Sequence, residues 1–331
     1  MNLIVYTYLA EIRKNLERIR RLTGGVELTF MVKADAYNHG LERVAGHTES
    51  YVDRFGVATA EEGARLRAAG ISKPVSVFTY TPRDARLTEE YSLTPVIYDL
   101  DTLASLGAGV READVKVDSG MHRLGFSSAE ECEELCKLLD KKGIRPRSVC
   151  THFRSAASIP TQSARFEEIT APLKAKYPDI VRHCAASDGI LEGALYDGVR
   201  AGRLAYESAM SVRSAIMDIH RVKRGDCVGY DGAYVAEKDT VVATVFGGYY
   251  DGIMRAYSGA EVIVNGVKRR IVGKVCMDMF LIELGDTRAK RGDEVTLIDP
   301  ATIDSYCKAA NATVYEVMTS VKGRARRRYI D

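Results

Sequence analysis

The chain has 331 residues, which is long enough for one large domain or two, with a sizeable hydrophobic core. Its 47 basic and 45 acidic residues nearly cancel, so the overall charge favours neither a nucleic acid nor a membrane surface as partner. The seven cysteines show no paired C-x-x-C spacing, and no stretch reads as a membrane span or a cleavable signal peptide, so we expect free thiols and a cytoplasmic location.

The first part of the chain alternates short β-rich runs with helical patterns. Apolar residues recur at helical spacing over residues 8–22, at Leu9, Ile12, Leu16, Ile19 and Leu22. Eight strands are then predicted, at 27–33, 55–59, 74–79, 94–98, 114–118, 148–153, 180–186 and 197–200. Helical stretches separate them, for example at 60–69, 128–142 and 162–176.

This alternation predicts an α/β fold, a (β/α)₈ TIM-type barrel. A doubly wound open sheet is the alternative, but no G-x-G-x-x-G follows the first strand. After about Ile219 the helical patterns give way to short strands at 239–246, 261–264 and 268–274. The pair Asn265-Gly266 between two of them predicts a hairpin. We therefore expect a barrel domain over residues 1–218 and a mostly-β C-terminal domain over residues 219–331.

Unusual residues stand near the predicted carboxyl ends of the barrel strands, where barrels place their chemistry. Lys33 ends the first predicted strand, and His152 and Arg200 end the sixth and the eighth. Burial disfavours a charged amine and lowers its pKa, which suits a lysine that forms a Schiff base. An ordinary lysine that reaches solvent from a strand end is the alternative.

Residues 33–40, Lys-Ala-Asp-Ala-Tyr-Asn-His-Gly, resemble the cofactor-lysine motif Lys-Ala-Asp-Ala-Tyr-x-His-Gly of alanine racemases. That family consists of fold-type III enzymes that use pyridoxal 5'-phosphate (PLP), with a barrel followed by a β domain. The resemblance implies that Lys33 binds PLP as a Schiff base and that Tyr37 lies in the cofactor site. The departure at Asn38, where the family has Gly, spares both residues.

Residues 115–125 resemble the family string Lys-Val-Asp-Thr-Gly-Met-x-Arg-Leu-Gly, with His122 in place of a glycine. The resemblance implies that Arg123 binds the substrate carboxylate, a task that suits the two-pronged guanidinium group. The lysine matching Lys116 is often carbamylated in that family and then supports the arginine. An ordinary salt-bridged lysine is the alternative for Lys116.

Further matches follow along the barrel. Thr151-His152 resembles the family's histidine beside the pyridine ring, although the next residues, 154–157, depart from Ala-x-Ala-Asp. Residues 199–206 resemble Val-Arg-Pro-Gly-x-x-Leu-Tyr, with Ala201 in place of proline, and Ala186-Ser187 stands where the family has Asn-Ser. The residues implied in cofactor binding are His152, Ser187, Arg200, Gly202 and Arg203.

Arg200 matches the arginine that faces the pyridine nitrogen. Because arginine keeps its proton near neutral pH, it leaves that nitrogen unprotonated and the ring a weaker electron sink. A short-lived carbanion then favours return of the proton over transamination, as a racemase requires.

The β domain carries matches as well. Residues 228–234 resemble the segment with the second catalytic base, which implies that role for Tyr230. Residues 248–252 match Gly-Tyr-x-Asp-Gly, whose tyrosine, here Tyr249, lines the entrance. The string Gly-Lys-Val-Cys-Met-Asp at 273–278 and the pair Tyr315-Glu316 also match, and they imply roles for Cys276, Met277, Asp278 and Tyr315.

The sequence is thus identified as a member of the alanine racemase family, which implies an isomerase that interconverts L-alanine and D-alanine and serves D-alanine biosynthesis. Lys33 would move the proton of the D-isomer and Tyr230 that of the L-isomer, with Arg123 and Met277 holding the carboxylate and Tyr315 near the cofactor phosphate. A racemase that prefers serine or another amino acid, and a fold-type III PLP decarboxylase, are the alternatives. We expect a head-to-tail homodimer with shared sites, a small amino-acid substrate, and no metal, nucleic acid or membrane partner.

Overall fold

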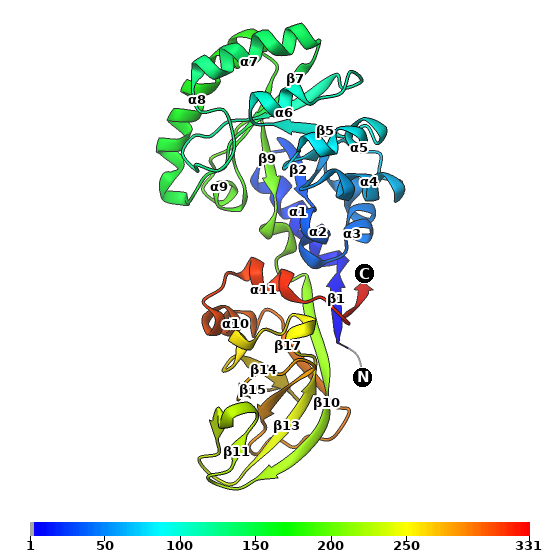
Figure 1. Cartoon of the computed structure of the whole chain (residues 1–331), viewed down its shortest axis with the longest axis vertical. Helices are drawn as coiled ribbons and strands as arrows, with labels where there is room; N and C mark the ends of the chain where they lie inside the picture. Colours follow the sequence, from blue (N-terminus) through cyan, green and yellow to red (C-terminus); the bar gives the residue numbers. More distant parts are fainter. Residues whose placement is uncertain (1–2) are drawn as a thin grey trace. The chain divides into compact units, whose positions relative to one another are not determined.

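The structure, a computed structural model, describes residues 3–331. Its residues form two compact units (Figure 1). The barrel unit consists of Ile12–Ala36 and Leu41–Tyr206. The β unit consists of Glu207–Asp331 together with Tyr37–Gly40 and the described residues up to Glu11. No helix in the described part is long and apolar enough to cross a membrane.

The barrel unit contains eight strands in the order β8-β7-β6-β5-β4-β3-β2-β9. All neighbouring strands are parallel, and the first barrel strand in the sequence, β2, pairs with the last barrel strand, β9. The ring closes because Asp197 and Arg200 donate backbone hydrogen bonds across from β9 to Arg182 and Ala185 beside β8. The strands are β2 (Glu27–Met31), β3 (Arg54–Val57), β4 (Val75–Val77), β5 (Thr94–Ile97), β6 (Glu112–Lys116), β7 (Arg145–Cys150), β8 (Val181–His183) and β9 (Gly198–Ala201).

The predicted barrel is therefore confirmed, with strand edges that differ by a few residues from the prediction. The strand predicted at 27–33 ends at Met31, and a short helix begins at Lys33. The helices are α1 (Leu9–Leu22), α2 (Lys33–Asn38), α3 (Leu41–Thr48), α4 (Ala60–Ala68), α5 (Ala85–Glu90), α6 (Leu100–Ala104), α7 (Ala129–Lys142), α8 (Ile159–Lys176) and α9 (Ser187–Leu191).

Ordinary helix signals explain where the long helices begin and end. In α1 the residues Leu9, Ile12, Leu16 and Ile19 are fully buried, as the helical spacing predicts, while Leu22 at the last turn is half exposed. The side chain of Ser128 caps the start of α7 by accepting from the amide of Glu131, and Gly143, with φ of 66°, ends it.

The β unit is built on an eight-stranded sheet in the order β13-β16-β15-β14-β17-β10-β1-β18, with β13 also paired to β10. The strands of this unit are β1 (Ile4–Tyr8), β10 (Met210–Val222), β11 (Cys227–Val228), β12 (Tyr234–Val235), β13 (Thr240–Phe246), β14 (Glu261–Val264), β15 (Val267–Val272), β16 (Met279–Glu283), β17 (Glu294–Ile298) and β18 (Arg326–Ile330). Its two α-helices are α10 (Ile303–Ala310) and α11 (Val314–Ser320).

The hairpin predicted at Asn265-Gly266 joins β14 to β15. Asn265 and Gly266 have φ of 49° and 79°, the left-handed pair that a two-residue type I′ turn requires. The sequence did not predict β1, because its register is set by β10 and β18, whose residues lie some 200 or more positions away in the chain.

Candidate active site

The backbone that follows Lys33 is left-handed. Five consecutive residues of α2, none of them glycine, have φ between 52° and 68°, namely Ala34, Asp35, Ala36, Tyr37 and Asn38. Each such residue costs about 1–2 kcal/mol relative to the right-handed form. Strain of this kind persists only where the surroundings hold it, and it gathers at functional sites. The backbone at the start of this turn, which carries Lys33, is therefore held in place by its surroundings.

The Lys33 side chain is partly buried two residues beyond the end of β2. Burial lowers the pKa of its amine, and the guanidinium groups of Arg123 and Arg200 lower it further, whereas the carboxylate of Glu62 raises it. The amine is therefore neutral over a wider pH range than an exposed lysine, which makes it a better nucleophile and base.

Lys116 is the last residue of β6 and is 8% exposed. Burial lowers the pKa of its amine, and the positive charges of Arg123, Arg200 and Lys33 lower it further. Cys150 acts in the opposite direction and raises this pKa. Four cationic groups thus act on one another at the carboxyl end of the barrel. Such a cluster suits an anionic ligand, for example a carboxylate or a phosphate.

The loop that carries Arg123 is built around Asp118. The Asp118 carboxylate accepts four backbone amides, from Gly120, Met121, His122 and Arg123, at 2.8–3.0 Å. Burial alone would raise its pKa, but these hydrogen bonds hold the pKa of the carboxyl below its usual value. His122 takes φ of 55°, which explains why a glycine would fit this position well. The Arg123 side chain remains exposed and directed by a rigid loop.

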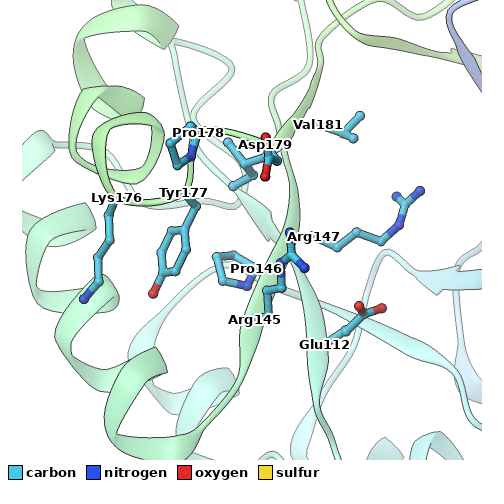
Figure 2. A pocket seen from close by; sticks show the side chains of 10 residues that line it. Glu112, Arg145, Pro146, Arg147, Lys176, Tyr177, Pro178, Asp179 and Val181 are labelled. Carbon is cyan, nitrogen blue, oxygen red and sulfur yellow. The ribbon is translucent and has the colours of Figure 1, made fainter.

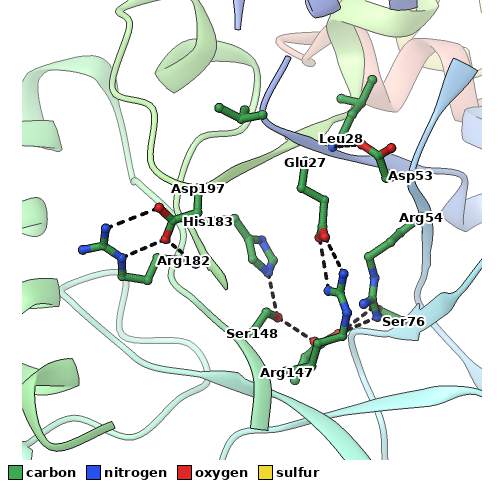
Figure 3. Close-up of polar contacts among 12 residues, drawn as sticks. Glu27, Leu28, Asp53, Arg54, Ser76, Arg147, Ser148, Arg182, His183 and Asp197 are labelled. Atoms are coloured by element: carbon green, nitrogen blue, oxygen red, sulfur yellow. Dashed lines mark hydrogen bonds and ion pairs between the residues drawn. The ribbon is translucent and has the colours of Figure 1, made fainter. Parts of the chain in front are cut away.

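Arg200 is the centre of a buried polar network, of which Figure 3 shows His183, Ser148 and Arg54. One guanidinium nitrogen donates to Nδ1 of His183 at 2.9 Å, and the other donates to the Thr151 carbonyl at 2.6 Å and approaches Nδ1 of His152 at 3.4 Å. Because arginine only donates, both Nδ1 atoms are acceptors and both rings carry their proton on Nε2.

The protons of this network continue toward Asp114. Nε2 of His183 donates to the Ser148 hydroxyl at 3.0 Å, and that hydroxyl donates to the Asp114 carboxylate at 2.6 Å. Asp114 is also paired with Arg54 at 3.3 Å, and both side chains are 3% exposed. Arg200 is therefore connected, through one neutral histidine, to a buried carboxylate.

Burial and neighbouring positive charge keep both histidines neutral. Burial, and then the Arg200 charge, lower the pKa of His152 to about 3. Burial, Arg200, Arg54 and Arg147 hold the pKa of His183 well below its ordinary value. Arg200 thus lies among neutral acceptors and keeps its positive charge at the heart of the site.

The predicted phosphate-binding residues lie around the turn after β9. Ser187 begins α9, is 5% exposed, and its hydroxyl accepts from the amide of Leu204 at 3.4 Å. Arg203 begins the 3₁₀ turn Arg203–Tyr206 and pairs with Asp188 at 3.5 Å. Among the described residues, the amide of Gly202 donates to no backbone carbonyl, so it is available to an acceptor from outside.

In the β unit, the segment with Cys276, Met277 and Asp278 runs beside the segment with Tyr249. The Tyr249 amide donates to the Cys276 carbonyl at 2.9 Å, and Gly247 donates to Asp278 at 2.9 Å. Between them lies Gly248, where a Cβ atom would stand 2.3 Å from two carbonyl oxygens, so only glycine fits. The Asp278 carboxylate pairs with Arg324 at 2.9 Å.

The remaining predicted tyrosines also belong to the β unit. The rings of Tyr37 and Tyr315 lie 6.0 Å apart between centroids, although 278 positions separate them in the chain. Tyr230 begins the short turn Tyr230–Gly232 between β11 and β12, and it is 64% exposed. Met277 is 52% exposed. The structure thus gathers Tyr37 with Tyr315, while Tyr230 and Met277 present their side chains to solvent.

Three polar residues of the barrel were missed by sequence reasoning: Glu62, Asp114 and His183. Asp114 and His183 stand in barrel strands, so a search of the strands for ionisable residues would have found them, whereas Glu62 lies in the first turn of α4 and carries no such signal. Glu62 accepts a hydrogen bond from the amide of Ala34, the first left-handed residue after Lys33, at 2.7 Å.

A separate hollow of about 370 Å³ lies at the opposite, amino end of the barrel strands (Figure 2). It contains none of the predicted site residues and is lined by the starts of β6, β7 and β8, among them Glu112, Arg145, Arg147 and Asp179. Arg147 is neutralised by an ion pair with Glu27. Barrels place their chemistry at the carboxyl ends, so this hollow is not the candidate site.

Comparison with known proteins gives matches over nearly the whole chain. Residues 8–209 match the family described as alanine racemase, N-terminal domain, and residues 209–329 match alanine racemase, C-terminal domain. An alanine racemase of Thermodesulfovibrio yellowstonii is 34% identical over 94% of this chain and 92% of its own length. The protein named alanine racemase, biosynthetic, of Escherichia coli K12 is 32% identical over 97% of both chains.

Solved structures agree with these matches. The alanine racemase of a D-cycloserine-producing Streptomyces lavendulae has a TM-score of 0.94 and 28% identity, covering 100% of this chain and 97% of that one. The alanine racemase of Bacillus anthracis, solved with bound L-Ala-P, has a TM-score of 0.92 and 28% identity, covering 100% and 95%.

Proposed function

The chain belongs to the alanine racemase family, and from that premise we propose that it interconverts L-alanine and D-alanine with PLP bound at the carboxyl end of the barrel. The observation that carries the proposal is the cluster at that end. A lysine amine with lowered pKa, Lys33, lies under the influence of Arg123 and Arg200, on a chain that matches both racemase domains. A negatively charged cofactor and a substrate with a carboxylate suit such a positively charged cluster.

The residues present fit PLP. The Lys33 amine would bind the cofactor covalently, and the buried Arg200 would face the pyridine nitrogen beside His152. Ser187 and the amides of Gly202 and Arg203 would hold the phosphate, and the family resemblance assigns cofactor roles to Tyr37 and Tyr315 as well. When bound, PLP withdraws electrons from the substrate and makes its Cα–H bond more acidic.

Two residues would move the proton on opposite faces of the substrate. We assign removal from D-alanine to Lys33 and removal from L-alanine to Tyr230. A phenol needs help to act as a base, and the neutral His152 ring, held by Arg200, would donate its Nε2 proton to the phenol oxygen in a hydrogen bond. Arg123 and the Met277 amide would hold the carboxylate in both directions.

Arg200 accounts for the choice of racemisation. It donates to three backbone carbonyls and two histidines, so its proton is held firmly by the barrel. A guanidinium at the pyridine nitrogen donates a hydrogen bond without giving up its proton. With PLP bound there, Arg200 would disfavour a long-lived charge on the substrate and favour return of the proton to the same carbon.

We further propose that two copies of the chain share their sites in a head-to-tail homodimer. Lys33 belongs to the barrel unit, whereas Tyr230 and Met277 belong to the β unit and are 64% and 52% exposed. Large side chains with this exposure suit a partner surface. Each site would then take Tyr230 and Met277 from the second copy. A cytoplasmic location fits this assignment.

The direct test mixes purified full-length protein with L-alanine and PLP and follows circular dichroism or optical rotation. The expected result is loss of signal to an equal mixture of isomers, and the same end point from D-alanine. Release of carbon dioxide would indicate a decarboxylase. Faster turnover of serine than of alanine would keep the racemase chemistry and overturn the substrate.

A further inference from the structure

The start of the strained turn after Lys33 is held by the carboxylate of Glu62. Oε1 of Glu62 accepts from the amide of Ala34 at 2.7 Å and lies 3.4 Å from the amide of Asp35. These are the first two residues of the left-handed run, with φ of 54° and 56°. The first amides of a helical turn have no carbonyl of the same turn to donate to, so these two depend on an acceptor elsewhere.

Glu62 contacts this turn and does not complete the capping box of its own helix. Helix α4 begins after Thr59, whose side chain accepts from the Glu62 amide, and the string Thr-Ala-Glu-Glu is the pattern of a capping box. In a capping box the glutamate would return a hydrogen bond to the Thr59 amide. Instead its second oxygen, Oε2, accepts from the amide of Ala58 at 2.8 Å.

The carboxylate thus connects the ends of two neighbouring strands. Ala58 directly follows β3, and Ala34 lies three residues after the end of β2. One oxygen is used on each side, so both oxygens of the carboxylate accept hydrogen bonds from backbone amides at the barrel mouth. A charged acceptor makes stronger hydrogen bonds than a neutral one, which is what a strained turn requires.

From these contacts we infer that Glu62 is the positioning residue of Lys33. Its carboxylate fixes the backbone on which Lys33 stands, so that the amine enters the site at a constant place relative to Arg123. The same negative charge raises the pKa of the Lys33 amine, against the cations Arg123 and Arg200, which lower it. Lys116 lies near as a further cation. The inference rests on the proposed function in taking Lys33 as the cofactor lysine.

The test compares Glu62→Gln, Glu62→Asp and the matched control Glu61→Gln in the full chain. Glu61 is exposed and carries the same charge one position away. Two measurements are independent of turnover. One is hydrogen exchange of the Ala34 and Asp35 amides in the cofactor-loaded protein. The other is the apparent pKa of Lys33, from the pH dependence of its acylation after the cofactor is removed, read by peptide mass spectrometry.

In Glu62→Gln we expect exchange of the two amides to rise about tenfold or more, the apparent pKa of Lys33 to fall, and kcat to fall about 10–100-fold. Glu62→Asp keeps the charge but is one methylene shorter, so it should retain the Lys33 pKa and lose the amide protection. This variant also keeps the test decisive if the glutamine variant folds poorly.

Unchanged amide exchange and unchanged Lys33 pKa in Glu62→Gln would overturn the inference, and so would equal effects from Glu61→Gln. If the variants change amide exchange and the Lys33 pKa as expected but the wild-type protein does not racemise alanine, the proposed function is contradicted and the role of Glu62 in the turn stands.

Discussion

At the scale of single residues, the hydrogen bonds of the site depend on Arg200, which can only donate. Arg200 cannot accept a hydrogen bond, so it determines which nitrogen of His152 and of His183 carries the proton. The His183 proton then points to Ser148 and onward to Asp114. The proton positions of the two histidine rings are therefore set by the buried residues around them.

The two neutral histidines make stability depend on pH. Their pKa values in the folded protein lie below the ordinary value near 6.5, at about 3 for His152, so below pH 6.5 the unfolded chain binds more protons. We expect the free energy of unfolding to fall as the pH falls from about 6.5 toward 3. Each such histidine contributes up to about 1.4 kcal/mol per pH unit.

Denaturant unfolding at pH 7.5, 6.0 and 5.0 would measure this slope. Replacing His183 by Gln should make the slope shallower, whatever it does to absolute stability. The exposed His220 provides the matched control, and its replacement by Gln should leave the slope unchanged. A wild-type protein equally stable at pH 7.5 and 5.0 would contradict the neutral state of the buried rings.

The ion pair of Arg54 and Asp114 gives a second prediction. Both side chains are 3% exposed, so Asp114→Asn leaves a buried guanidinium without its counter-charge. We expect a loss of about 3–5 kcal/mol in the free energy of unfolding, together with lower kcat because the His183–Arg200 contact loses its anchor. The double variant Arg54→Met, Asp114→Asn should lose less than the sum of the single losses. Additive losses would argue against the pair.

A third prediction concerns the two proposed bases. Tyr230→Phe removes the hydroxyl assigned to L-alanine and leaves Lys33 intact. Exchange of the Cα hydrogen for deuterium should fall about 10²–10⁴-fold from L-alanine and far less from D-alanine. Nuclear magnetic resonance of each isomer in heavy water measures both rates. Equal losses on the two isomers would exclude a division of the bases by face.

At the scale of elements, the unusual feature is α2, where the left-handed residues run from Ala34 to Asn38. Alanine is strained there, whereas glycine is not. Replacing alanine by glycine therefore relieves strain in the folded state, which stabilises it, but adds freedom to the unfolded chain, which has the opposite effect on stability. The exposed position, Ala34, allows the two effects to be compared without disturbing a core.

We expect Ala34→Gly to raise the free energy of unfolding by about 0.5–1 kcal/mol, since relief of a left-handed alanine outweighs the added freedom of the unfolded chain. The matched control is Ala64→Gly in the middle of the right-handed helix α4, which should lower it by about 0.5–1 kcal/mol. Thermal and denaturant unfolding measure both. Destabilisation of similar size at the two positions would show that α2 is not strained.

At the scale of the whole molecule, the proposed bases belong to different compact units. Lys33 is in the barrel unit and Tyr230 is in the β unit, exposed on the short turn after β11. A symmetric dimer made from such a chain can complete two sites at once, since each copy offers what the other needs.

Mixing inactive Lys33→Ala protein with inactive Tyr230→Phe protein tests this arrangement. After subunit exchange, about half of the dimers are hybrids, and one of the two sites in each hybrid has both bases, so activity should return to about a quarter of wild type. Each variant incubated alone provides the control. If mass spectrometry shows hybrids but the mixture stays inactive, each site is built from a single copy.

The sequence alone determined the features that depend on neighbours along the chain. The helical spacing of Leu9, Ile12, Leu16 and Ile19, the pair Asn265-Gly266 and the eight β-rich runs each carry their own signal, because side-chain period and turn chemistry act over a few residues. The motif at Lys33 likewise lies in one short stretch.

Only the tertiary structure decided what depends on residues distant in the chain. Closure of the barrel brings Asp114, Ser148, His183 and Arg200 into one network, although more than 80 positions separate its ends. The same closure brings Glu62 to the turn after Lys33, where its carboxylate accepts from Ala34 and not from the Thr59 amide that a capping box would use. No local pattern predicts five left-handed residues that are not glycine, because their cost is offset by contacts that exist only once the strands have assembled.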